Sequence, residues 1–367
     1  MRLTIILCIL LTTPIFAMYR IELHPVYSKS NHHAGYAAKV IIGDPEKEFR
    51  VILDTVTPLI WVAGASCSIW PSNCHNKQLY PSSCSRFKGT LSHNYNPKRS
   101  ACLNAYEDNI LINSLDGGRV NFSNSLFGTP SYLNWPEWEN YQEIDGVFGL
   151  SALHVNSLIK GLTYAPLFLK MDINPLKKAI RENELAPVIS IILPALDSNK
   201  TAMLTLGGRD DKLCDLDNER NESLTASRNR YNFKFLSIKM NNTKFSDKTV
   251  TMFAYPNVIN PYISVPNEFM GKIVKDLKAQ MDPTTNKYLV NCQGSFEPFE
   301  MFTPENKYIV SPKHFIIKHN PNDTRCELAF KNFEGAGKKV VLGIPFLHQY
   351  CVTLEPRSNR INFAPII

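Results

Sequence analysis

Short apolar runs that end at turn residues dominate the chain and predict a mostly β protein. Residues 19–24 alternate apolar and polar side chains, a pattern typical of a strand at the edge of a sheet. Two segments have helical spacing instead, residues 175–183 and residues 267–281. The apolar side chains of the second helix fall on one face, which we expect to pack in the core: Phe269, Ile273, Val274 and Leu277.

One apolar run, interrupted by a polar pair, occurs twice. Residues 51–62 have a counterpart at residues 253–265, and Asp54 of the first run coincides with Asn257 of the second. The other matched pairs are Val56 with Ile259, Pro58 with Pro261, Ile60 with Ile263, and Val62 with Val265. An apolar-apolar-glycine segment then follows each run, at residues 147–150 and 341–344. These two copies predict a duplicated architecture.

This layout resembles the pepsin-like aspartic peptidases over residues 35–367. The segments that carry the resemblance come in the order that the family shows: residues 41–49, Asp54-Thr55, Phe127-Gly128, residues 144–150, residues 205–210, residues 341–351 and residues 360–365. The resemblance implies a mostly β, bilobal fold with a central cleft between two duplicated lobes. We expect the lobes to span residues 18–204 and 205–367, after a signal peptide at residues 1–17.

The two catalytic loops depart from the family pattern. The family carries Asp-Thr/Ser-Gly twice, whereas this chain has Asp54-Thr55-Val56 and Asn257-Val258-Ile259. Two adjacent carboxyl groups share one proton, and each in turn donates or accepts it during hydrolysis. An asparagine can donate a hydrogen bond but cannot exchange a proton, so catalysis should fall by about 10²–10⁴-fold at least. The resemblance therefore implies that Asp54 is the first catalytic position and Asn257 a degenerate second one.

Another interpretation of these two positions depends on the register. A lone aspartate between strand residues is often a turn or cap residue. The register could also shift by one or two residues, but no aspartate lies between Asp247 and Asp276 to replace Asn257.

The residues beside the two catalytic positions also differ from the family. Val56 and Ile259 stand where the family has glycine, and β-branched residues are poorly suited to positive φ. We therefore expect a different backbone path or strain, with both side chains near the substrate. In the family each Thr/Ser hydroxyl bonds across to the other loop, which Thr55 can do and Val258 cannot.

Family members close a hairpin flap, carrying a tyrosine, over the cleft. By position Tyr106 is the candidate, and residues 116–118 form the expected hairpin tip. Tyr106 could equally be an ordinary strand residue.

The N-terminus and the cysteines predict an oxidising compartment. Residues 1–17 have the basic start, apolar stretch and small final residue of a signal peptide, and no other run could span a bilayer. Asp54 follows the expected cleavage site by 37 residues, too few for the family's propeptide, unless the chain is a truncated gene product. We expect a secreted, extracellular protein or one in the lysosomal lumen.

Eight cysteines remain beyond the signal peptide, an even number that favours disulfides. The resemblance suggests Cys67–Cys74 and Cys292–Cys326, and leaves Cys84–Cys102 and Cys214–Cys351 as plausible pairs. The rival interpretation is a zinc site, but no Cys-x-x-Cys pair or histidine cluster supports one, so we expect no metal ion and no cofactor.

Five Asn-x-Ser/Thr sequences favour glycosylation of exposed loops: Asn121, Asn199, Asn221, Asn241 and Asn322. The formal charge of +7 is spread along the chain without a dense basic block, so nothing indicates a nucleic-acid partner. We expect a monomer without a transmembrane segment.

Three hypotheses follow for function. The first is an inactive homologue that binds an extended peptide or a protein in the interlobe cleft. The second is a weakly active acid endopeptidase that uses Asp54, and the third is a glycosylated structural or antigen-like protein. Fold alone does not separate them, because function depends on the site.

Overall fold

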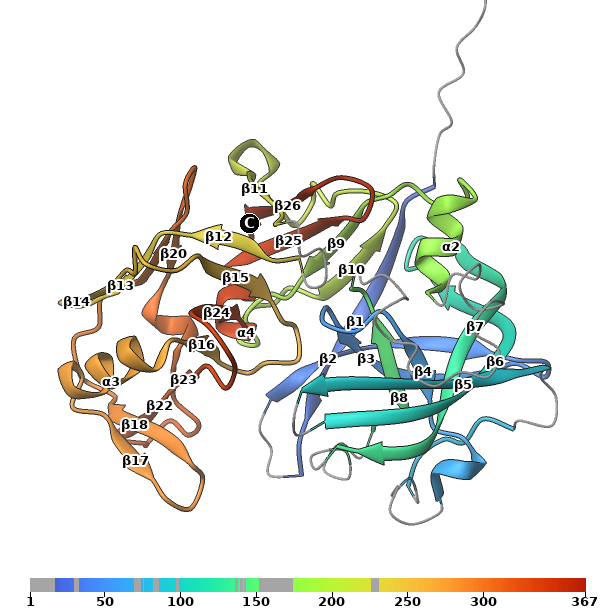
Figure 1. Ribbon diagram of the computed structural model, residues 1–367, viewed down its shortest axis with the longest axis horizontal. Coiled ribbons are helices and arrows are strands. Elements are labelled where there is room, and N and C mark those ends of the chain that lie inside the picture. The colour runs from blue at the N-terminus through green and yellow to red at the C-terminus, as the bar shows by residue number, and fades with distance from the viewer. Residues whose placement is uncertain are drawn as a thin grey trace, which may run out of the picture.

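Four β-sheets form the part of the chain that the computed structural model describes. The described residues are 17–29, 33–68, 74, 76–81, 86–96, 99–135, 138, 141, 143–151, 174–225 and 231–367. Figure 1 shows two β-rich halves that meet around the strands β1, β9, β10, β25 and β26. The mostly β, bilobal fold predicted from the sequence is confirmed.

The largest sheet has 13 strands and runs through both halves. Its central part consists of β11 (Arg220–Ser223), β26 (Arg360–Pro365), β25 (Tyr350–Glu355), β9 (Ile189–Ile192), β10 (Ala202–Leu206) and β1 (Tyr19–Tyr27). It continues into the N-terminal half through β2 (His33–Ile42), β3 (Lys47–Asp54), β8 (Gly146–Gly149), β4 (Ile60–Val62), β7 (Arg119–Asn134), β6 (Arg99–Asn113) and β5 (Arg86–Asn96). The lobe boundary expected after residue 204 falls inside β10.

The strand β1 joins these two parts of the large sheet. Its first residues pair with β10 and its last ones with β2. The predicted strand is therefore confirmed, but the prediction that it lies at an edge is wrong. The outward side of β1 carries a buried ion pair, since Arg20 donates two hydrogen bonds, of 2.8 and 3.0 Å, to the carboxylate of Asp210.

The C-terminal half adds three smaller sheets. The first contains β12 (Phe233–Phe235), β15 (Met252–Pro256), β24 (Lys339–Leu342), β16 (Ile263–Val265) and β23 (Phe330–Asn332). The second contains β14 (Thr243–Phe245), β13 (Ser237–Met240), β19 (Phe299–Phe302) and β20 (Lys307–Val310). The third contains β17 (Gln280–Asp282), β18 (Lys287–Asn291), β22 (Arg325–Leu328) and β21 (Ile316–Ile317).

The strand pairing repeats between the halves, which confirms the predicted duplication. In the N-terminal half β3 runs parallel to β8, β8 antiparallel to β4, and β4 parallel to β7. In the C-terminal half β15 runs parallel to β24, β24 antiparallel to β16, and β16 parallel to β23. In each half, strands from two separate chain segments therefore alternate in the sheet. The first of these segments carries one of the matched loops.

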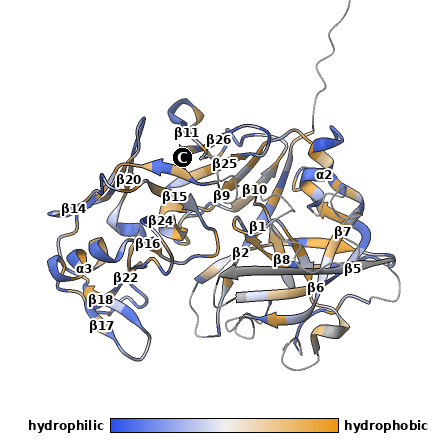
Figure 2. Cartoon of the chain, viewed as in Figure 1, coloured by the Kyte–Doolittle hydropathy of each residue, from blue (hydrophilic) through white to orange (hydrophobic). Residues whose placement is uncertain are grey.

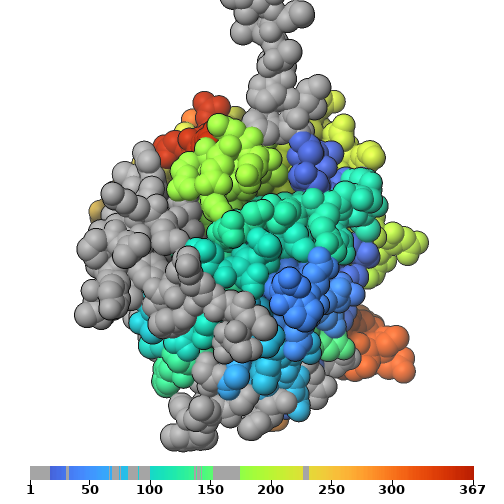
Figure 3. Space-filling model, turned by 90° about the vertical axis from the view of Figure 1, so that its right-hand side faces the viewer, coloured from blue at the N-terminus to red at the C-terminus, as the bar shows by residue number. Residues whose placement is uncertain are grey.

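Both predicted helices are present, with shorter ends. The helix α2 (Pro175–Arg181) starts at the N-cap Asn174 and packs on β7, as Figures 1 and 3 show. The helix α3 (Asn267–Asp276) buries the predicted Phe269 and Ile273 in the core together with Met270, which was not predicted. The predicted Val274 and Leu277 are half-buried and pack against the same core. A third, short helix, α4 (Ile344–Leu347), follows Gly343. No helix within the described ranges is long and apolar enough to cross a membrane.

Buried apolar side chains fill the interior of each half. Figure 2 marks hydrophobic positions along the strands, and all residues of β8 and β9 are buried. In the N-terminal half Trp61 and Trp138 are buried, with ring centroids 5.0 Å apart. This core holds the matched loops from behind.

Two glycines, Gly149 and Gly343, allow a strand in each half to pass close to the backbone of the matched loop. A Cβ on Gly149 would lie 2.5 Å from the carbonyl oxygens of both Thr57 and Leu59. A Cβ on Gly343 would lie 2.3 Å from the oxygen of Asn260 and 2.0 Å from that of Tyr262. The apolar-apolar-glycine sequence therefore occurs twice because only glycine lets each strand pass behind its loop.

We expect Gly343→Ala to lower the free energy of unfolding by about 3 kcal/mol or more, because the new methyl group would overlap backbone that cannot move away. Urea unfolding would measure it. The matched control is Gly271→Ala on α3, where a Cβ meets nothing within 4 Å. That change should stabilise the protein by about 0.5–1 kcal/mol. Equal effects of the two substitutions would show that the close backbone approach at Gly343 does not require glycine.

Candidate functional site

The two loops matched in the sequence adopt equivalent conformations. Asp54 is the last residue of β3, and its Oδ1 accepts a 2.7 Å hydrogen bond from the Val56 N–H. Asn257 directly follows β15, and its Oδ1 accepts a 3.1 Å hydrogen bond from the Ile259 N–H. The same two-residue turn thus forms around a carboxylate in one loop and around an amide in the other.

The strand behind each loop forms a backbone hydrogen bond with the matched residue, through that residue's carbonyl in one half and its N–H in the other. The carbonyl of Asp54 accepts a hydrogen bond from Leu150 N, and Asn257 N donates to the carbonyl of Leu342. Further along, Leu59 N donates to the Thr57 hydroxyl and Tyr262 N donates to the Asn260 side chain, both at 3.3 Å. The register that places Asn257 opposite Asp54 in sequence therefore also holds in space.

One hydroxyl connects the two loops. Thr55 Oγ1 donates a 2.9 Å hydrogen bond to the Pro256 carbonyl and accepts a 3.4 Å hydrogen bond from the Val258 N–H. Thr55 and Val258 are both buried. The family's cross-loop hydrogen bonds are thus made from the Thr55 side, whereas Val258 has no hydroxyl to return them. Because these bonds flank Asn257, they bring the two matched loops together.

Neither Val56 nor Ile259 has a positive φ, so of the two expected alternatives the loops take a different backbone path and do not carry strain there. Their side chains instead pack across the junction between the halves. Val56 forms a small buried cluster with Tyr255 and Val341, which belong to β15 and β24. Ile259 packs against the apolar cluster of the N-terminal half that includes Trp61. Each replaced glycine thus contributes an apolar contact to the opposite half.

This packing leaves little of the first loop accessible. Asp54 and Thr55 have no exposed surface, and Val56 is 8% exposed, whereas Asn257 and Ile259 remain half-buried. The Asp54 carboxylate is therefore enclosed in this structure.

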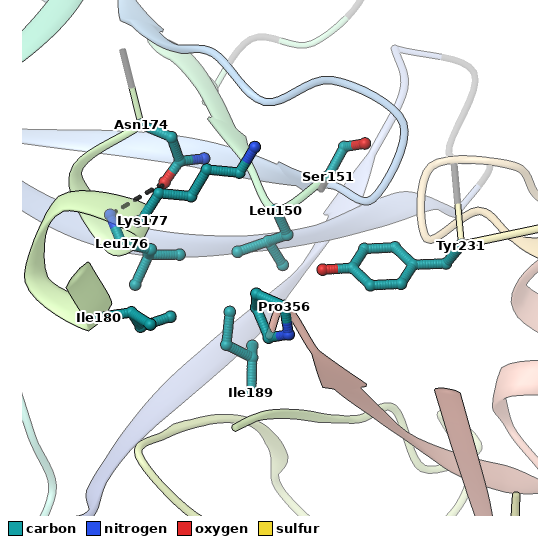
Figure 4. Close-up of a pocket in the computed structure, with 9 residues that line it drawn as sticks. All are labelled: Leu150, Ser151, Asn174, Leu176, Lys177, Ile180, Ile189, Tyr231 and Pro356. Carbon is teal, nitrogen blue, oxygen red and sulfur yellow. Dashed lines mark hydrogen bonds between the residues drawn. The ribbon is translucent and has the colours of Figure 1, made fainter. Parts of the chain in front are cut away.

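A residue that the sequence reasoning missed supports the first loop from behind. The buried amide of Asn174 donates 2.7 and 3.0 Å hydrogen bonds to the carbonyls of Pro58 and Gly149, while its oxygen caps α2. An Asn-Pro pair before a helix is the signal that could have indicated this cap. Figure 4 shows Asn174 and Leu150 beside a cavity that Tyr231 also lines. The cavity measures about 10 Å³, which is too small for a peptide or a cofactor.

Tyr106 lies far from any hairpin tip. It pairs with Phe87 on β5 and Phe127 on β7, and its ring packs against Tyr80 and Phe127. Tyr106 is therefore a half-buried strand residue at the border of the core.

The turn predicted at residues 116–118 exists, but it lies against β1. Leu115 N donates to the Arg20 carbonyl, and Arg20 N donates to the Ser114 hydroxyl. β5 and β6 also pair as an antiparallel hairpin, in which Asn96 lies opposite Arg99. The assignment of a flap stays a prediction.

Three disulfides occur among the described cysteines: Cys67–Cys74, Cys214–Cys351 and Cys292–Cys326. These are three of the four pairs weighed from the sequence. Cys102 is exposed on β6, and Cys84, its expected partner, lies outside the described residues. Within the same residues no group of three or more His, Cys, Asp or Glu is arranged to hold a metal ion.

The five glycosylation candidates all lie in described segments. Asn121, Asn199, Asn221 and Asn322 are exposed. Asn241 is half-buried, and its side chain accepts a hydrogen bond from Glu297 N. Modification of these residues stays a prediction.

The comparisons with known proteins agree with the site geometry. The family model described as eukaryotic aspartyl protease matches residues 35–366. The chain belongs to this family. Its relatives include aspartic protease 6 of Caenorhabditis elegans, at 22% identity over 90% of this chain and 81% of the relative. Pepsin A of Sus scrofa is 23% identical over 90% of this chain and 81% of the relative. Plasmepsin VIII of Plasmodium berghei is 24% identical over 90% of this chain and 87% of the relative.

We expect Thr55→Val to lower the free energy of unfolding by about 1–3 kcal/mol, because the buried carbonyl of Pro256 and the N–H of Val258 would lose their partner at nearly constant volume. Chemical denaturation would measure the change. The matched control, Thr251→Val, alters an exposed threonine and should shift stability by about 0.5 kcal/mol or less. A Thr55→Val protein as stable as the wild type would show that the cross-loop bonds are dispensable.

Proposed function

We propose that this family member is catalytically inactive and binds an extended peptide or protein segment between its lobes. The observation that carries the proposal is Asn257, which occupies the position equivalent to Asp54 in backbone register, hydrogen bonding and turn conformation. Hydrolysis by a carboxyl pair needs a proton that moves between the two groups. An amide cannot lose or gain that proton at any pH at which the protein is folded.

Two further features support the loss of catalysis. Asp54 has no exposed surface, and the Val56 side chain packs over the same loop into the cluster with Tyr255 and Val341. The sequence also has no acidic residue between Asp247 and Glu268, so the second loop has no neighbouring carboxylate to replace the missing one. Activation of a water molecule between two acids therefore has neither the second acid nor an open approach.

The case for binding rests on what the fold keeps. The Thr55 bridge and the two matched loops preserve the junction on which the family's peptide-binding cleft is built. Half-buried Ile259 gives that junction an apolar surface where the family has a bare glycine backbone. An extended peptide would pair with neighbouring backbone as an added strand and contact Ile259 with its side chains.

We further propose that the protein acts in the lumen of the secretory pathway, the lysosome or outside the cell, as a monomer. The three disulfides support an oxidising compartment.

Cleavage of an unfolded protein substrate between about pH 3 and 6, where a carboxyl pair can hold one proton, should be the same for the wild type and for Asp54→Ala. Fragments would be quantified by mass spectrometry. The matched variant Asn257→Asp restores the second acid alone, and we expect it to stay inactive because Val56 still covers the loop. Cleavage by the wild type that Asp54→Ala abolishes would overturn the proposal and favour the weakly active endopeptidase.

Binding should depend on the surface of the second loop rather than on Asp54. In fluorescence anisotropy with a library of labelled extended peptides at neutral pH, Ile259→Lys should weaken any binding at least tenfold, about 1.4 kcal/mol. Asp54→Ala should leave it within about twofold, because Asp54 is enclosed. If no peptide binds the wild type, or if both variants bind as it does, the binding proposal is wrong and a structural role remains.

A further inference from the structure

Three histidines from separate parts of the chain meet where the two halves join. His33 begins β2, His314 ends the short 3-10 helix at Pro312–His314, and His348 caps α4. The His348 ring centroid lies 6.1 Å from that of His33 and 6.0 Å from that of His314. Tyr36 completes this histidine cluster, with its ring 4.8 Å from that of His33. The cluster therefore joins a strand of the N-terminal half to two helices of the C-terminal half.

The hydrogen bonds of the cluster suit neutral imidazoles. The Tyr36 hydroxyl lies 3.2 Å from the Pro194 carbonyl, to which it donates, and 3.3 Å from Nε2 of His348. Because the phenol has only one proton, Nε2 of His348 carries the proton of the second bond. Nε2 of His33 is enclosed and has no hydrogen-bond partner among the described residues. A proton on His33 would therefore add a buried charge and a buried donor that nothing accepts.

Few charges face these rings from the surrounding elements. His33 is approached by the Gly35 backbone and by the ring of Tyr27, 5.7 Å away, and His348 by the other two histidines. His314 faces the cation Lys313, the carboxylate Asp197 and the side chain of Gln349. Asp197 is thus the one carboxylate that acts on the cluster from the described residues, and it acts on His314 alone.

Removal from water is the main effect on all three rings. It lowers the pKa of His33 to about 4 from an ordinary 6.5, and the pKa of His314 to about 4, where Lys313 adds to the decrease. The pKa of His348 falls to about 3, because burial is reinforced by its two histidine neighbours. The rings are therefore neutral at pH 7 in the folded protein.

We propose that the histidine cluster is an acid-sensitive latch, which holds the two halves together while its rings are neutral and releases them when it is protonated. A cation on any ring lies about 6 Å from another imidazole and has to reach water. His33 and His348 are half-buried and His314 is buried, so the rings gain fuller contact with water when β2 and α4 move apart. This proposal does not depend on the proposed function.

Opening the latch would also act on the second matched loop. The first residue of α4, Ile344, donates its N–H to the carbonyl of Asn260, three residues after Asn257. A displacement of α4 is therefore transmitted directly to the loop that carries Asn257 and Ile259. Entry into an acidic compartment would change the junction at which the family binds its peptides.

The sign of the pH effect follows from the depressed pKa values. The unfolded chain binds protons on these histidines near pH 6.5, whereas the folded chain binds them only near pH 3–4. The stabilisation is complete above about pH 6.5 and is lost as the pH falls towards 4. Between those values unfolding should take up about three protons through the cluster.

The test is urea unfolding at a series of pH values from 7.5 to 4, for the wild type and for His33→Gln/His348→Gln. The slope of the unfolding free energy against pH gives the proton uptake, and near pH 5 it should be smaller by about two protons in the double variant. The control is His24→Gln, which removes a half-buried histidine of β1 outside the cluster and should keep the wild-type slope. Equal slopes for the wild type and the double variant would overturn the proposal.

Hydrogen exchange tests the release itself. At pH 4.5, after correction for the intrinsic rate, residues 33–42 and 344–347 should lose protection in the wild type and keep it in the double variant, while α3 is unchanged in both. Loss of protection in both the wild type and the double variant would overturn the proposal of a latch. If the double variant does not fold, His33→Gln alone replaces it, since its Nε2 has no partner to lose, and the slope should fall by about one proton. Tyr36→Phe keeps all histidines and should lower stability by the same amount at every pH.

Discussion

The close passage of Gly149 and Gly343 behind their loops is the constraint on which the rest of this structure depends. In each half a parallel strand pair, β3 with β8 and β15 with β24, brings a glycine against loop carbonyls at a distance that excludes any side chain. The loops cannot relax away, because their ends continue into buried strands. As a result the turn around Asp54 and the turn around Asn257 keep the same form even though their chemistry differs.

The persistence of these turns separates architecture from catalysis. Hydrogen bonds from backbone N–H groups to Oδ1 fix both loops, and a carboxylate and an amide accept such bonds equally well. An asparagine at position 257 therefore forms the same turn as an aspartate would. The glycines next to the two positions were replaced by branched apolar residues, and Val56 gained contacts with Tyr255 and Val341 in the other half. Under the proposed function, this part of the site belongs to the interlobe packing.

The two halves are held together by interactions of different kinds. The central strands form a continuous sheet, in which β1 is fixed by the buried pair of Arg20 and Asp210. Near the start of β2 the contact with α4 depends on uncharged imidazoles and the Tyr36 hydroxyl. A contact between neutral imidazoles depends on their protonation state. The junction at the histidine cluster is thus dependent on acidity.

The sequence by itself determined the mostly β character, the duplication, both longer helices and the identity of the residues at the two catalytic positions, because periodicity, capping residues and repeated motifs are local properties. It also indicated three of the disulfide pairs, two of them through the family resemblance. It could not decide the position of Tyr106, because the local sequence around a tyrosine does not distinguish a hairpin tip from the body of a strand. Only the tertiary structure decided that Val56 and Ile259 avoid strain, that β1 lies inside the large sheet, and that Asn174 supports the first loop. The same holds for the histidine cluster. His33 is far in sequence from His314 and His348, and it meets them only because the halves fold against each other. Contacts of this kind depend on how distant segments pack, and no local pattern in the chain records them.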